Sequence, residues 1–155
     1  MDGNFKLSKG DIDIETQDVL ELFYAGIRAN QTRTTMDRLL KKFLNEICAD
    51  ILHGDNRSRA EEFVNLAKTD STAATNIVIA YVKQLRVRTQ LPKNDQHYIN
   101  PSYLPNKIKP IKKLVAMSDV SLPWHRIRSY YPELDNTHKG RGYSRDEIKK
   151  LCLRR

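Results

Sequence analysis

Apolar residues recur at three- and four-residue steps along much of this chain, which is the period of a helix with one buried face. A short apolar group around Leu20 and Phe23 predicts a helix over residues 16–24, and Gly26 is placed to end it. A longer stripe predicts a helix over residues 32–52. The stripe comprises Met36, Leu39, Leu40, Phe43, Leu44, Ile47, Cys48 and Ile51.

The same pattern predicts further helices over residues 58–68, 73–88, 105–118 and, after Pro123, 124–131. Pro110 lies within one of them and should either kink that helix or mark its first turn. Residues 89–104 are polar and contain two prolines, so we expect a long loop there. No segment has the alternating pattern of a strand, and the expected class is therefore all-α, a compact bundle of four to five main helices.

The pattern also divides the chain into four segments. Residues 1–15 have no sustained period and are expected to be a flexible lead-in, and residues 16–131 should form the bundle. Residues 132–142 have the composition of a linker. Residues 143–155 then begin a helix with a capping box at Ser144, which we expect to be the truncated start of another domain.

Composition narrows the class of protein. The chain has 155 residues, of which 39% are hydrophobic and 30% charged, and it has no apolar run long enough to span a membrane. We therefore expect a soluble, cytoplasmic protein with one folded domain. The two cysteines, Cys48 and Cys152, are more simply interpreted as buried thiols than as a disulfide, which the sequence leaves open.

The distribution of charge suggests a polyanionic partner. The net charge is +8, but residues 1–27 carry −4, residues 28–104 carry +4 and residues 105–155 carry +8. Such asymmetry favours nucleic acid. A basic surface that only maintains solubility is the alternative, and charge alone does not decide between them.

Little else in the sequence indicates chemistry. The four histidines do not pair at metal-binding spacing, and we find neither a phosphate-binding glycine loop nor a nucleophile motif, so no metal, cofactor or catalysis is expected. Thr32 to Thr35 open the longest predicted helix, where free amides and hydroxyls suit a phosphate. Plain N-capping explains them equally well. Trp124, Tyr130 and Tyr131 could stack on bases, but an aromatic cluster beside a proline is more often part of a core.

Three segments together resemble the N-terminal core-binding domain of archaeal-type tyrosine recombinases, of the phage-integrase family. YAGIRANQTRTTMDRLLKKFL, residues 24–44, resembles the first helix of that domain. IKPIKKLVAMSDVSLPWHRIRSYYPE, residues 108–133, resembles its last helix and the segment that follows. GYSRDEIKKLC, residues 142–152, resembles the entry to the catalytic domain. Pro110, the long loop at 89–104 and the acidic first 27 residues depart from the family pattern.

The resemblance implies a SAM-like helical bundle that binds duplex DNA at attachment-type sites, chiefly through backbone contacts, as a module of DNA integration and recombination. The catalytic residues of the family belong to a domain that would begin where this chain stops, so the chain itself is expected to be non-enzymatic and nucleoid-associated. Thr32 and Arg33 match the helix start of the family, whereas the other expected DNA contacts rest on charge and helix face alone. Those are Lys41, Arg86, Lys107, Lys112, Lys113, Arg126 and Arg141.

A second hypothesis belongs to another class of function. A truncated recombinase could bind other recombinase protomers and inhibit them without acting on DNA itself. The acidic first 27 residues would suit a protein contact of this kind, or could fold back over the basic face.

Overall fold

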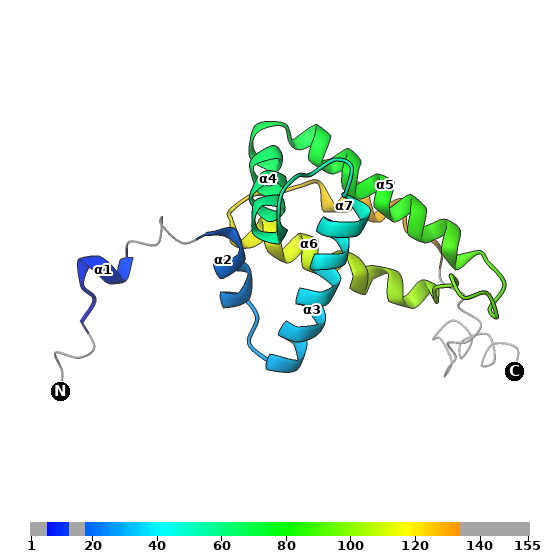
Figure 1. Ribbon diagram of the computed structural model, residues 1–155, viewed down its shortest axis with the longest axis horizontal. Coiled ribbons are helices and arrows are strands. Elements are labelled where there is room, and N and C mark those ends of the chain that lie inside the picture. Colours follow the sequence, from blue (N-terminus) through cyan, green and yellow to red (C-terminus); the bar gives the residue numbers. More distant parts are fainter. Residues whose placement is uncertain (1–5, 13–17, 134–155) are drawn as a thin grey trace, which may run out of the picture.

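A computed structural model describes residues 6–12 and 18–133 of the chain. Within these residues the secondary structure is entirely helical, as predicted (Figure 1). The first helix of the described residues is α1 (Lys9–Ile12), a single turn inside the predicted lead-in. The predicted helix at 143–155, and all but the first two residues of the predicted linker, lie outside the described residues.

Five helices of seven residues or more form the bundle, and a short sixth closes it. They are α2 (Val19–Ala25), α3 (Asn30–Lys42), α4 (Asn56–Thr69), α5 (Ser71–Thr89), α6 (Leu104–Met117) and α7 (Trp124–Arg128). A π-helical turn, η2 (Phe43–Ile47), continues α3, and a 3₁₀ turn, η3 (Pro101–Tyr103), leads into α6. The predicted all-α bundle is thus confirmed for the described residues.

Local sequence explains where the middle helices begin. The side chains of Asp18, Asp55 and Asp70 precede α2, α4 and α5, and each accepts hydrogen bonds from backbone amides of the first turn. Gly54 has a φ of 96°, the left-handed conformation expected of a glycine in the turn before α4. These caps explain why the observed starts of α4 and α5 fall within two residues of the predicted ones.

Helix α6 lies at the centre of the fold and packs against α2, α3, α4 and α5. Leu104, Ile108, Ile111, Leu114 and Val115 of this helix are buried, although Leu104 was expected in the preceding loop. The helix continues through Pro110, although proline has no N–H to donate to the carbonyl four residues earlier. Pro110 is itself buried, so its ring is part of the core.

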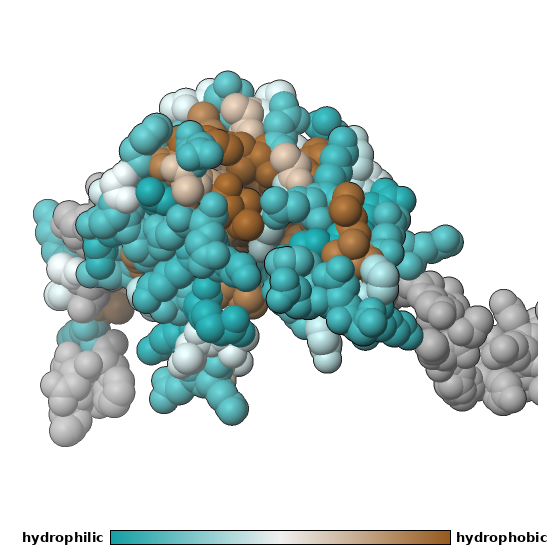
Figure 2. Space-filling view, turned by 45° about the vertical axis from the view of Figure 1, so that its right-hand side comes forward, coloured by the Kyte–Doolittle hydropathy of each residue, from teal (hydrophilic) through white to brown (hydrophobic). Residues whose placement is uncertain are grey.

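Aromatic packing connects three of the helices inside this core. The ring of Phe43 lies 5.5 Å from that of Phe63 at nearly a right angle and 5.3 Å from that of Tyr81. The Phe43–Phe63 pair is edge-to-face, an arrangement that adds to the free energy gained from burial alone. The face drawn in Figure 2 is mainly hydrophilic, with apolar side chains visible among the polar ones in its upper half.

The burial predicted for the helix over residues 32–52 is wrong at the C-terminal end of that helix. The amide of Cys48 donates to the carbonyl of Phe43, five residues earlier, so η2 contains one residue more than an α-helical turn. This insertion shifts every following side chain around the axis. Leu52 is consequently buried with 1% of its surface exposed, whereas Ile51, predicted to be buried, is 47% exposed. The regular helix therefore ends at Ile47, short of residue 52.

This shift in register gives a direct test by mutation. Leu52→Ala should lower the free energy of unfolding by about 2–5 kcal/mol, the usual cost of emptying a buried leucine site. Ile51→Ala, on the neighbouring exposed position, should lower it by less than about 1 kcal/mol. Urea denaturation of both variants measures the difference. Equal losses at the two positions would contradict the burial of Leu52 and the exposure of Ile51.

Candidate nucleic-acid interface

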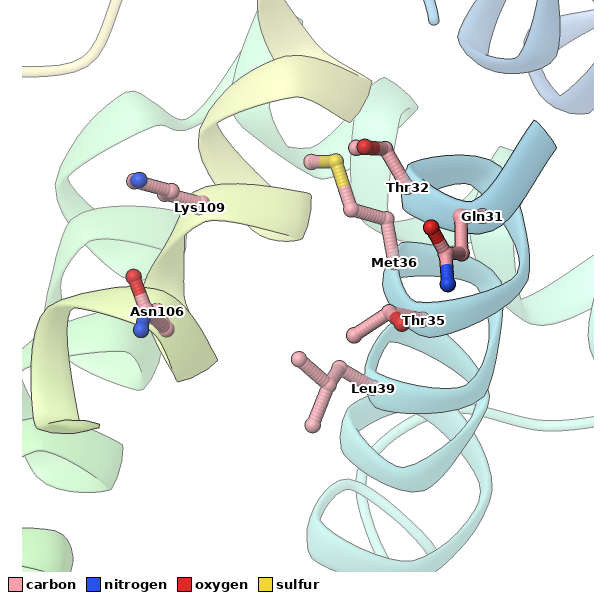
Figure 3. A pocket seen from close by; sticks show the side chains of 7 residues that line it. All are labelled: Gln31, Thr32, Thr35, Met36, Leu39, Asn106 and Lys109. Atoms are coloured by element: carbon pink, nitrogen blue, oxygen red, sulfur yellow. The ribbon is translucent and has the colours of Figure 1, made fainter. Parts of the chain in front are cut away.

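A groove runs between α3 and α6 on the outside of the bundle. Two adjoining pockets of about 410 and 340 Å³ form it, and both are lined by Met36 and Lys109. Figure 3 shows Met36 and Leu39 projecting from α3 towards α6, with Asn106 and Lys109 across from them. The complete lining is Gln31, Thr32, Thr35, Met36, Leu39, Asn106, Lys109, Lys112, Lys113 and Ala116.

Helix periodicity explains why the lysines collect along this groove. Lys109, Lys112 and Lys113 are three and four residues apart, so they share one face of α6, opposite its buried stripe. On α3 the residues lining the groove also follow three- and four-residue steps, from Thr32 to Leu39. Two helices packed side by side therefore present one cationic edge and one uncharged edge.

A second group of cations lies where α3 and α5 end and α6 begins. Arg38 and Lys42 come from α3, Arg88 comes from α5, and Lys107 comes from α6. Burial lowers the pKa of the Lys107 ammonium, and the positive charges of Lys42, Arg88 and Arg38 lower it further. No carboxylate appears among the charges that act on Lys107. The four residues are called the Lys107 cluster below.

Two acidic side chains near the start of the bundle, Asp37 and Asp18, have partners outside the groove and the Lys107 cluster. Asp37 accepts a hydrogen bond from the hydroxyl of Tyr24 and lies 3.0 Å from the ammonium of Lys41. Asp18 pairs with Arg57 at the start of α2. Within the described part of the chain, none of the groove lysines or the Lys107 cluster forms an ion pair with a carboxylate. Arg88 donates from Nε to the carbonyl of His97 at 2.8 Å, but no carboxylate of the described residues neutralises its charge or that of the others.

The structure brings only some of the predicted DNA contacts together. Thr32, Lys112 and Lys113 line the groove, and Lys107 lies with Lys42, Arg88 and Arg38 where α3 and α5 end. Lys41 is paired with Asp37, and the guanidinium of Arg33 donates to the carbonyl of Ile27 at 3.1 Å, so that it holds the turn before α3. Thr32 is the third residue of α3, because the helix begins at Asn30 rather than at 32.

The remaining predicted contacts lie apart from the groove. Arg86 is exposed in the last turn of α5, and Arg126 is exposed on α7. Arg141 is outside the described residues. One contact connects α7 to the groove, because the ammonium of Lys112 lies 5.8 Å from the ring centre of Trp124. Trp124 and Tyr130 are partly buried against the core, as the non-stacking interpretation expects.

Sequence reasoning missed two features of this surface. Arg38 and Lys42 are four residues apart on one helix, a spacing that could have suggested a shared face, but Arg88 joins them only through tertiary packing. Met36 and Leu39 were assigned to the core. Leu39 is 8% exposed and Met36 is partly buried, and both nevertheless line the groove.

Other kinds of site receive no support from the described residues. No group of three or more His, Cys, Asp or Glu side chains within residues 6–12 and 18–133 is placed to bind a metal ion. Burial raises the pKa of the Cys48 thiol to about 11, which keeps it protonated and unreactive. None of the helices in these ranges is both long enough and apolar enough to cross a membrane.

Comparisons of this chain with protein-family models, with curated proteins and with solved structures found no match.

The electrostatic origin of the Lys107 cluster can be tested by titration. Lys42→Gln should raise the pKa of Lys107 part of the way to its ordinary value, because one repelling charge is removed while burial remains. Side-chain nitrogen NMR of the lysines follows this pKa. Lys68→Gln, on the exposed end of α4, serves as the control and should leave Lys107 unchanged. An unchanged pKa of Lys107 in Lys42→Gln would contradict the assignment of the cluster.

Proposed function

We propose that this chain is a DNA-binding module that contacts the backbone of duplex DNA through α3 and α6. The observation that carries the proposal is the convergence of cations without ion pairs: the Lys107 cluster at one end and Lys109, Lys112 and Lys113 along the groove. We call these residues together the basic face. Phosphates would satisfy this charge and release counterions.

The dimensions of the basic face agree with this role. Along α6 the lysines of the basic face extend from Lys107 to Lys113, about 9 Å at 1.5 Å per residue, a length that covers neighbouring phosphates of one strand. The N-terminus of α3, at Asn30, has no side-chain cap, so its first amides could bind a further phosphate. Contacts of this type position a protein on DNA without reading its sequence.

The resemblance to the core-binding domain of tyrosine recombinases makes the proposal more specific. On that basis the chain serves site-specific recombination or integration by binding attachment-type duplex DNA, carries out no strand transfer itself, and is found with the nucleoid. The segments that carry the resemblance include α3, α6 and α7, and the first two supply most of the basic face.

Charge reversal on α6 tests the proposal. Lys112→Glu with Lys113→Glu should weaken binding to random duplex DNA, and the slope of log K against log salt should flatten by up to about two, because each lost phosphate contact removes about 0.9 from it. Fluorescence anisotropy over a salt series, with duplex and single-stranded DNA, measures both quantities. Circular dichroism establishes that the variant is folded.

Lys68→Glu is the matched control, since Lys68 is an exposed lysine in the last turn of α4. It should change the affinity much less than the double variant and leave the slope nearly unchanged. Equal effects of the two substitutions would show that net charge, and not the basic face, determines binding. Absence of binding by the wild-type chain even at low salt would refute the DNA-binding proposal.

A further inference from the structure

The groove between α3 and α6 has an apolar floor that a phosphate-binding surface does not require. Met36, Leu39 and Ala116 line it, whereas phosphate contacts need only cations and hydrogen-bond donors. Ala116 is exposed, and the partly buried side chain of Met36 projects towards α6 (Figure 3). Aliphatic side chains of a partner would lose contact with water on this floor and so gain free energy.

The two edges of the groove differ in charge. The α6 edge carries Lys109, Lys112 and Lys113, and the α3 edge carries Gln31, Thr32 and Thr35, which are uncharged. The lysines occupy successive turns of α6, so they repeat with the pitch of a helix laid beside them. A ligand that complements this groove is therefore apolar underneath, acidic on the side facing α6 and neutral on the side facing α3.

We propose that the groove binds an amphipathic α-helix of a partner protein, with acidic residues along the flank that faces α6. Such a helix places apolar residues at every third or fourth position on Met36, Leu39 and Ala116, the usual way in which a helix occupies a groove. The α6 lining extends from Asn106 to Ala116, about 15 Å, which is close to three helical turns.

Binding of the acidic helix does not depend on the proposed DNA binding, but the helix and duplex DNA would compete for the same lysines. Lys109, Lys112 and Lys113 belong both to the groove and to the basic face. An acidic helix in the groove neutralises these lysines and covers them, so DNA would retain only the Lys107 cluster. The proposed helix is thus also a means by which a partner protein could regulate DNA binding.

Two synthetic peptides of about twelve residues test the inference against the full chain. Both have leucines at alternating three- and four-residue steps and are helix-stapled on the solvent face. One has glutamates on the flank facing α6, and the other has lysines at the same positions. We expect the acidic peptide to bind at least about tenfold more tightly than the basic one in fluorescence anisotropy. It should also shift the methyl NMR signals of Met36, Leu39 and Ala116.

Two substitutions that do not alter charge separate this groove from the DNA-binding face. Met36→Gln makes the floor polar, and Ala116→Gln fills it from an exposed helical position that tolerates glutamine. Each should lower the affinity for the acidic peptide about fivefold to tenfold. The salt slope of duplex DNA binding should stay unchanged. Conversely, Arg38→Gln with Lys42→Gln should weaken DNA binding and affect the peptide less.

Three results would overturn the inference. The first is absence of acidic-peptide binding up to about 1 mM. The second is equal affinity for the two peptides, and the third is a set of methyl shifts located away from Met36, Leu39 and Ala116. If duplex DNA shifts these three methyl signals and the acidic peptide does not, the floor contacts nucleic acid and the assignment of a helical partner is wrong. Peptide binding with no DNA binding would retain this inference and reject only the proposed function.

Discussion

The burial of one face of α6 is the constraint on which the rest of the structure depends. Leu104, Ile108, Ile111, Leu114 and Val115 pack against four other helices, and this packing fixes the rotation of α6 about its axis. Once that rotation is set, helix geometry places Lys109, Lys112 and Lys113 together on the opposite face. The core and the proposed binding face are therefore two sides of one helix, and neither can be rotated without the other.

The cations of the basic face repel one another, because no carboxylate of the described residues pairs with them to neutralise their charge. Asp37 directly precedes Arg38 in α3, but its carboxylate is engaged by the hydroxyl of Tyr24 and the ammonium of Lys41. Burial lowers the pKa of Lys107, and the positive charges of Lys42, Arg88 and Arg38 lower it further. A polyanion or an acidic helix would relieve that repulsion, which is the physical reason for interpreting this surface as a binding surface rather than a solubilising one.

Much of the fold was predictable because the apolar periodicity is strong and its caps are explicit. In α4, Ala60, Phe63, Val64 and Ala67 recur at three- and four-residue steps, and all four are buried. The error at Ile51 has a local cause, since one additional residue in η2 changes the helix period in a way that no hydrophobic pattern reveals.

The candidate site was predictable only where its residues lie on a single helix. The charge pattern identified Lys107, Lys112 and Lys113, whereas the apolar floor and the contribution of Arg88 exist only after α3, α5 and α6 have packed.

The central claim is that duplex DNA binds to the lysines of the α3–α6 face. Side-chain ammonium NMR of the wild-type chain, titrated with a random-sequence duplex, tests it residue by residue. The signals of Lys107, Lys109, Lys112 and Lys113 should shift together on binding, added salt should reverse these shifts, and Lys68 on α4 should stay unchanged. Uniform small shifts of all lysines, or shifts confined to other helices, would contradict it.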